Sequence, residues 1–325
     1  MRRAHPDWAI FAVLVDEPPD EADTGLLSAT FDGIMRIHEL GIPRHRSWLF
    51  KHDIVEACTA VKGHALLRLL ETHDKVVYFD PDIALFHPLD DLEALLDHAS
   101  VVLTPHQTSP NLAAPAVLDN ELTSLQYGVY NLGFLAVRAD AAGTTFARWW
   151  ATQLYRACYD EVERGIFTDQ KYCDLVPALF ERVHIHRDPG YNVASWNIGC
   201  RTVRINHGGN IEVDGGPLRF YHFTKIGSAG DVMTERYALD NSAIFEIWEW
   251  YRRELAANTV AWVPKGYWGF GRFSNGLTIP KPARVVYRRR PDLLAAFADP
   301  FDAGAGGFLQ WLRHEQPALL EDAIS

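Results

Sequence analysis

The chain has 325 residues, of which 48% are hydrophobic and 22% are charged, so it is long enough to bury a large core. This composition excludes a disordered, collagen-like or coiled-coil protein. Its 31 lysines and arginines against 42 aspartates and glutamates give a formal charge of −11, which excludes a general nucleic-acid binder. An anionic substrate would therefore need neutralisation by a metal ion or a few placed cations.

The first part of the chain predicts strands that alternate with helices. A continuous apolar run over 8–15 indicates a buried strand. Apolar residues recur at steps of three and four over 51–71, which indicates an amphipathic helix. The next predicted elements are strand 75–79, helix 92–96, strand 100–103 and strand 130–137. This alternation predicts an α/β sheet, at least for residues 8–140.

The second part continues the pattern and then changes character. The predicted helices are 144–159, a further one within 167–180, and 241–255. The predicted strands are 183–187, 202–205 and 218–223. Residues 262–282 are rich in glycine, proline and aromatics, and helix returns from Leu293. We therefore expect a main domain over 1–257 and a helical and irregular C-terminal extension over 258–325.

The cysteines and the apolar runs indicate in which cellular compartment the protein is expected. The four cysteines form no C-x-x-C pair, which predicts reduced thiols rather than a zinc cluster or a redox dithiol. No run of 18 apolar residues is present, and no apolar signal core precedes Asp7. These features predict a cytoplasmic protein.

Asp80-Pro81-Asp82 is the central chemical feature of the sequence. The triplet follows the strand 75–79, and ligands of open α/β sheets bind at the carboxyl ends of strands. Two carboxylates one residue apart can both reach Mg²⁺ or Mn²⁺, which take oxygen ligands and substrate phosphates. The alternative is a solvated turn after a strand.

Several segments together resemble the GT-A glycosyltransferases, especially glycosyltransferase family 8 and its glycogenin-like relatives. The resemblance covers about residues 8–230. The segments that carry it, in the family's order, are K-V-V-Y-F-D-P-D-I-A-L-F, Asn131-Leu132-Gly133-Phe134, Thr168-Asp169-Gln170, Tyr191-Asn192 and Phe220-Tyr221-His222-Phe223. The resemblance implies a Rossmann-like, nucleotide-sugar-binding α/β fold whose mixed central sheet is flanked by helices.

The resemblance also implies roles for individual residues. Asp80, Asp82 and His222 would hold Mn²⁺ or Mg²⁺, and Asp80 would thereby also contact the donor. The catalytic set would be Asp169, Asn131 and Gln170, which contact the transferred sugar or line its pocket. The remaining donor contacts would be Gly133, Lys62 and Lys225.

Most of these residues have a second interpretation from the sequence alone. His222 lies in an aromatic strand, where a histidine is often a hydrogen-bonded core residue. Asn131 with Gly133 is also typical of a tightly packed strand start. Asp169 is a good helix cap, and Lys62 is typical of a lysine that lays its stem along a helix surface.

The resemblance implies a nucleotide-sugar-dependent hexosyltransferase of polysaccharide biosynthesis that acts with retention. A UDP-sugar is the favoured donor, and a glycan or lipid-linked glycan is the expected acceptor. The family's Lys-Pro-Trp after the histidine is replaced here by T-K-I-G-S-A-G-D. The family pattern around Lys225 is therefore not intact, and it does not by itself define the role of this lysine. Residues 1–8 resemble the tail of the family's first helix, so the family's opening strand is expected to be absent.

The C-terminal part offers an aromatic loop over 262–273 and the basic run Arg288-Arg289-Arg290. The favoured interpretation is a loop packed over the core beside a solvated basic run. The alternative is a platform for a sugar acceptor or a peripheral contact with anionic lipid at the inner face of a membrane.

Two other classes of function remain open at this stage. A haloacid-dehalogenase-type phosphatase also places Asp-x-Asp after an apolar strand, but Ala84 stands where that class usually has Thr or Val. An eroded transferase that only binds a nucleotide sugar or a carbohydrate is the other alternative. Turnover of a donor would separate a transferase from an eroded binder, and release of free phosphate from a phosphomonoester would indicate the phosphatase.

Overall fold

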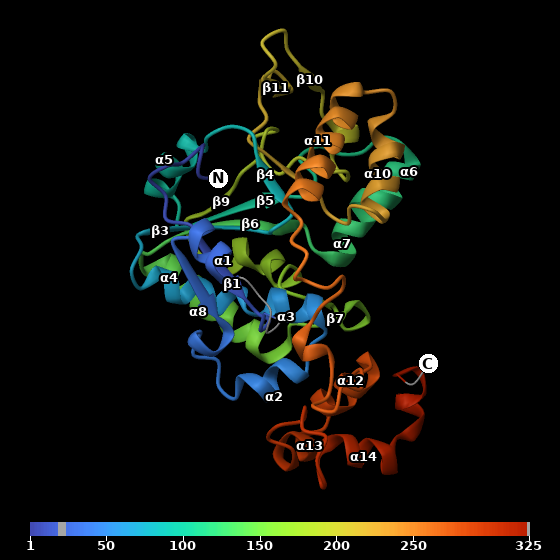
Figure 1. Ribbon diagram of the computed structural model, residues 1–325. Coiled ribbons are helices and arrows are strands. Elements are labelled where there is room, and N and C mark those ends of the chain that lie inside the picture. Colours follow the sequence, from blue (N-terminus) through green and yellow to red (C-terminus); the bar gives the residue numbers. More distant parts are fainter. Residues whose placement is uncertain (19–23, 324–325) are drawn as a thin grey trace. The chain divides into compact units, whose positions relative to one another are not determined.

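The computed structural model describes residues 1–18 and 24–323 and has a mixed α/β architecture (Figure 1). The chain divides into two compact units. The first unit comprises Met1–Trp8, Leu66–Trp150 and Glu161–Thr259. The second unit comprises Ala9–Ala65, Ala151–Asp160 and Val260–Ser325. The domain boundary near residue 258 stays a prediction.

The elements of the first unit include the strands that carry the motifs. Its strands are β3 (Lys75–Phe79), β4 (Ile83–Leu85), β5 (Val101–Pro105), β6 (Tyr130–Arg138), β8 (Ile166–Phe167), β9 (Val183–Ile185), β10 (Val203–Ile205), β11 (Ile211–Val213), β12 (Gly216–Pro217) and β13 (Phe220–His222). Its helical segments are α5 (Asp90–His98), α6 (Ala114–Ala116), η2 (Val117–Leu122), α7 (Thr123–Tyr127), η3 (Val162–Arg164), η4 (Lys171–Leu175), α9 (Val176–Leu179), η5 (Ile198–Cys200), α10 (Ala229–Ala238) and α11 (Ser242–Asn258).

The second unit is mostly helical. Its elements are β1 (Phe11–Leu14), α1 (Thr24–Thr30), β2 (Gly33–Arg36), η1 (Ile37–Glu39), α2 (His45–Phe50), α3 (Ile54–Ala60), η6 (Gly269–Gly271), α12 (Lys281–Arg289), α13 (Pro291–Ala296), α14 (Phe308–Glu315) and η7 (Pro317–Ala323). Three elements contain residues of both units, namely α4 (Lys62–Leu70), α8 (Ala141–Ala157) and β7 (Asp160–Glu161).

A four-stranded mixed sheet with the order β3-β6-β5-β9 organises the first unit. The strand β6 runs antiparallel to both of its neighbours, and β5 and β9 are parallel. Residues 130–137 of β6 are all buried, because the central strand is covered on both faces. In Figure 1, α5 and the first part of α8 lie on opposite faces of this sheet. The predicted mixed sheet flanked by helices is therefore confirmed.

The second unit is built around an aromatic core. The ring of Phe50 lies 5.0–5.4 Å from the rings of Tyr287, Phe301 and Phe308. The Arg284 side chain is 1% exposed and donates hydrogen bonds to the carbonyls of Phe50 and Phe270. The C-terminal segment therefore packs on the helix α2 of its own unit.

Several predicted elements differ from the structure. The strand β1 pairs with β2 in a separate two-stranded parallel sheet, so residues 8–140 do not form one sheet. The predicted helix 51–71 is divided between α3 and α4 at Val61, the C-cap of α3. Residues 1–8 form hydrogen-bonded turns rather than the end of a helix.

The helix predicted within 167–180 is confirmed only for a short stretch. Phe167 belongs to β8, Thr168 adopts a left-handed φ of 42°, and only the short segments η4 and α9 follow. Pro177 lacks the amide hydrogen that a longer helix would need at that position. Within the predicted irregular stretch, α12 begins after Pro280 and has a proline in its first turn, where proline is tolerated.

No helix among the described residues is long and apolar enough to cross a membrane.

Because His52 is buried, we expect the free energy of unfolding to fall on acidification. Its side chain is 0% exposed, Nδ1 lies 2.9 Å from the Trp48 carbonyl oxygen, and burial lowers the pKa of His52 from 6.5 to about 3. In the unfolded chain the His52 imidazole therefore becomes protonated below about pH 6.5, whereas in the folded chain it becomes protonated only near pH 3. This difference lowers the free energy of unfolding by about 2 kcal/mol between pH 7 and pH 5.

Urea denaturation at both pH values measures this effect. The His52→Gln variant is expected to lose about 2 kcal/mol of the pH dependence, because it removes the titrating ring. His207→Gln, at an exposed position, is the matched control. An unchanged pH dependence in His52→Gln would contradict the prediction.

Candidate functional site

The turn that follows β3 presents two carboxylates. The amide of Asp80 donates to the Gly133 carbonyl at 2.8 Å, which extends the β3–β6 ladder, and the amide of Ile83 donates back to the Asp80 carbonyl at 3.2 Å. Between them, Pro81 fixes φ. Both carboxylates therefore come from a short, hydrogen-bonded connection between β3 and β4.

The pairing of β4 with β13 brings the histidine to this turn. The two strands are antiparallel, with His222 opposite Ile83, and the amide of Phe223 donates to the Asp82 carbonyl at 2.8 Å. The imidazole thus comes from a strand 140 positions after Asp82, and its place beside the acids depends on the register of a ladder.

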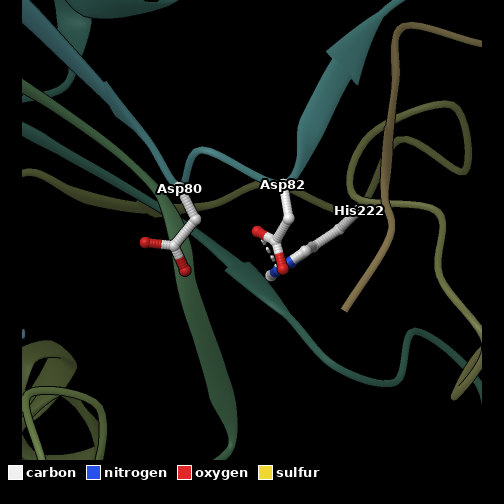
Figure 2. Close-up of side chains that lie close together, drawn as sticks. All are labelled: Asp80, Asp82 and His222. Carbon is white, nitrogen blue, oxygen red and sulfur yellow. Dashed lines mark ion pairs between the residues drawn. The ribbon is translucent and has the colours of Figure 1, made fainter. Parts of the chain in front are cut away.

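Asp80, Asp82 and His222 form one group of ligand atoms that all lie within 4.8 Å of one another. Figure 2 shows the imidazole of His222 directed at the Asp82 carboxylate, with Asp80 beside them. The His222 Nε2 to Asp82 Oδ1 distance is 3.0 Å, and Tyr78 Oη donates to Asp80 Oδ1 at 2.5 Å. The histidine is 4% exposed, whereas the side chain of Asp82 is 36% exposed, so the group is open on the carboxylate side.

The amide of Asn131 determines which nitrogen of His222 faces the carboxylates. The Asn131 Oδ1 atom accepts the backbone N–H of Gly133 at 3.1 Å, which identifies it as the oxygen. The same oxygen lies 3.1 Å from His222 Nδ1, so Nδ1 carries a proton in this hydrogen bond. The other nitrogen, Nε2, points at Asp82, and this contact needs a proton or a metal ion between the two atoms.

Further residues support this amide, and sequence reasoning gave them no such role. Asn192 is fully buried and donates to Asn131 Oδ1 at 3.2 Å and to the Thr104 hydroxyl at 3.1 Å. His106 Nε2 lies 3.3 Å from Asn131 Nδ2, and burial lowers the pKa of His106 to about 4, so it accepts as a neutral ring. No motif or spacing in the sequence pointed to His106.

Gly133 is required at its position because the His222 ring lies against its Cα. A Cβ atom at residue 133 would lie 2.5 Å from His222 Cε1 and 2.9 Å from Asn131 Oδ1. Both distances are shorter than real Cβ contacts, so any side chain here would displace the imidazole or the amide.

Gln170 lies against the start of β6, and Asp169 is buried beside it in the sequence. The side chain of Gln170 donates to the Tyr127 carbonyl at 3.1 Å and accepts from the Leu132 amide at 3.4 Å. Asp169 is 3% exposed, and its carboxylate accepts from the Thr168 hydroxyl at 3.2 Å. The N-cap residue of η4 is Gln170 and no side-chain hydrogen bond caps that segment, so Asp169 is not its cap. Asp169 does not belong to the metal-ligand group.

The two lysines differ in their settings. Lys225 is exposed in the loop between β13 and α10, and its φ of 51° is left-handed. Lys62 is 5% exposed at the start of α4 and belongs to the second unit. The structure thus brings Asn131, Gly133 and the three metal-ligand candidates together. Lys225 lies in the loop that follows His222 in the sequence.

Another group of metal-binding side chains occurs in the described part of the chain, namely Asp91, His186 and Asp188. It suits a cation less well, because Asp91 Oδ1 accepts from Tyr191 Oη at 2.8 Å and lies 3.6 Å from Arg219. A guanidinium at that distance already neutralises the carboxylate.

Comparison with known proteins gives two relatives, both from Bacillus subtilis (strain 168). "Uncharacterized protein YfnF" is 30% identical over 184 residues, which are 53% of this chain and 57% of that protein. "Uncharacterized protein YfnD" is 26% identical over 261 residues, which are 77% of this chain and 78% of that protein. The chain thus spans little more than half the length of the first relative. No protein-family model and no solved structure matches the chain.

Proposed function

We propose that the first unit has a GT-A fold and transfers a sugar from a nucleoside-diphosphate sugar to a glycan or lipid-linked glycan in a metal-dependent reaction. The observation that supports this proposal most strongly is the group Asp80, Asp82 and His222. Its ligand atoms come from the β3–β4 turn and from β13 and lie within 4.8 Å of one another. A UDP-sugar is the favoured donor, and retention of configuration is the outcome that the family resemblance favours.

The donor atoms of this group fit a divalent cation. Two carboxylates and one imidazole combine oxygen and nitrogen ligands, a set that suits Mn²⁺ better than Mg²⁺. A bound cation would supply positive charge to the leaving diphosphate. The chain's own contribution is to hold the three ligands in place, through the Tyr78 hydroxyl on Asp80 and the Asn131 amide on His222.

Other residues would act on the donor from around this group. In the proposal, Lys225 contacts the diphosphate, and Asp169 and Gln170 contact the transferred sugar.

A thermal-shift screen tests the proposal. The probes are UDP, GDP and their common sugar conjugates, each with and without Mn²⁺, because a ligand that binds only the folded state raises the melting temperature. We expect a shift that requires both a nucleotide and the metal. Release of free UDP or GDP from the conjugate that binds then establishes turnover.

Two results would contradict the proposal. Metal-dependent binding without turnover on any acceptor would support a binding protein. Release of phosphate from a phosphomonoester such as p-nitrophenyl phosphate, abolished by Asp80→Asn, would support a phosphatase.

The Gly133→Ala variant is expected to weaken Mn²⁺ binding at least about tenfold. The added methyl group would displace the His222 ring from Asn131, and loss of such supporting contacts costs 10- to 100-fold in metal affinity. The Mn²⁺ affinity is measured by calorimetry or by the electron paramagnetic resonance signal of the free ion. Gly216→Ala is the matched control, since its Cβ would have no neighbour closer than 3.8 Å. Equal Mn²⁺ affinity in both variants would contradict the arrangement.

A further inference from the structure

An open groove lies beside α11, on the first unit. It encloses about 770 Å³, which is within the range of small-molecule sites. The residues that line it come from the end of β4, from the β10–β11 hairpin and from one face of α11. They are Phe86, Ile205, Gly209, Ile211, Asp240, Ser242, Phe245, Glu246, Ile247, Glu249, Trp250 and Arg253. We call it the α11 groove.

The floor of the α11 groove is aromatic. The rings of Phe86 and Trp250 lie 5.1 Å apart at an angle of 59°. Both side chains are partly buried at the edge of the core formed by β13 and α11, as is Ile211, so packing holds them in place. The side chain of Phe245 is 38% exposed in the same lining. Fixed aromatic faces therefore remain open to a ligand.

The polar groups of the α11 groove lack partners among the described residues. The carboxylates of Asp240, Glu246 and Glu249 and the guanidinium of Arg253 are all exposed and make no hydrogen bond or ion pair there. Residues 246, 249, 250 and 253 recur at helical spacing, which places them on one face of α11. Three acceptor groups and one donor group thus border the aromatic floor.

We propose that the α11 groove binds a neutral oligosaccharide. A sugar ring has an apolar face that can stack on Trp250 or Phe86, and hydroxyl groups at its rim that donate to carboxylates. An apolar peptide would leave three carboxylates desolvated, which is unfavourable. The excess of carboxylates repels nucleic acid and other polyanions, and Arg253 opposes a simple cation. A neutral ligand that carries both donors and acceptors fits all four groups.

This site is separate from the metal-ligand group and does not depend on the proposed transferase activity. Phe86 follows Asp82 by four residues along β4, a separation of roughly 13 Å in an extended strand. The groove and the metal-ligand group therefore lie along one strand, and the groove can be tested without a nucleotide or a metal.

Binding of defined oligosaccharides tests the proposal. The probes are maltohexaose, cellohexaose and laminarihexaose, titrated into the full chain by calorimetry and by saturation-transfer NMR in the presence of EDTA. We expect saturable binding of at least one probe. Trp250→Ala is expected to weaken that binding at least about tenfold, equivalent to about 1.4 kcal/mol. Trp250→Leu, which keeps apolar bulk, is expected to weaken binding similarly. It shows that the loss follows from removal of the aromatic ring and not from unfolding.

The charged groups are tested by a matched pair of variants. Glu246→Gln combined with Glu249→Gln is expected to weaken binding about three- to tenfold, because a charged acceptor becomes a neutral one. Glu254→Gln removes one carboxylate charge from the same helix but outside the groove, and should leave the affinity unchanged. The proposal is overturned if the wild type binds none of the probes, or if Trp250→Ala and Trp250→Leu bind as the wild type does. Binding of spermine in place of the sugars, lost in the same variants, would assign the groove to a cation and overturn it too.

Discussion

Asp82→Ala is expected to abolish metal-dependent nucleotide binding and to leave the fold intact. The variant removes one of three protein ligands. The affinity for Mn²⁺ should therefore fall at least about a hundredfold, which is more than the loss expected when a residue that only hydrogen-bonds to a ligand is removed. The carboxylate is 36% exposed and its printed ion pair is the one with His222, so little stability depends on it. Calorimetric titration of Mn²⁺, followed by UDP in saturating Mn²⁺, measures both affinities.

A second variant decides between the two groups of metal-binding side chains. His186→Ala removes the imidazole of the group Asp91, His186 and Asp188, and is expected to keep wild-type affinity for Mn²⁺. Wild-type affinity in Asp82→Ala with loss in His186→Ala would move the metal to that other group. Melting temperatures of the metal-free variants, expected within about 2 °C of the wild type for Asp82→Ala, show that the fold is retained.

Arg288→Ala is expected to lower the free energy of unfolding by about 3–5 kcal/mol. The guanidinium lies 3.1 Å from the Glu56 carboxylate, and the two side chains are 2% and 1% exposed. It also lies 3.8 Å from the centre of the Tyr159 ring and donates to the Lys51 carbonyl at 3.1 Å. Its removal would leave the Glu56 charge largely buried, with the Lys281 ammonium group at 3.7 Å from it.

Urea denaturation with two further variants identifies the cause of this loss. The double variant Arg288→Ala with Glu56→Gln is expected to regain part of the stability, because the buried charge is removed. Arg290→Ala, which breaks an exposed pair with Asp292, should have little effect. Unfolding curves of Arg288→Ala that coincide with those of Arg290→Ala would show that the buried pair of Arg288 and Glu56 contributes nothing to the free energy of unfolding.

Local sequence patterns predicted the regular elements where one strong signal operates. The strand 75–79 is β3, and the strand 130–137 is β6 except for its last residue, because continuous β-branched and aromatic residues suit a covered strand. The helix 241–255 is α11, which begins with Asn241 as a capping residue. The helix predicted within 167–180 is restricted to the short segments η4 and α9, because Thr168 is left-handed and Pro177 interrupts the apolar spacing.

The basic run shows the limits of such patterns most clearly. Arg288, Arg289 and Arg290 were expected to be solvated together, yet the side chain of Arg288 is 2% exposed against Glu56. A helix turns successive residues toward different surroundings, so Arg288 and Arg289 at the end of α12 and Arg290 at its C-cap have different environments. The partner on α3 is 232 residues away in the sequence, and no local pattern indicates it.

The sequence by itself determined the α/β class, the strand that ends in Asp80-Pro81-Asp82 and the candidate ligands. These depend on the periodicity of side chains and on residue type, which are local properties. Only the tertiary structure decided that His222 lies beside Asp82, that Asn131 orients its imidazole and that Gly133 leaves room for the ring. Those features depend on the register of two ladders, and register follows from the packing of segments far apart in the chain.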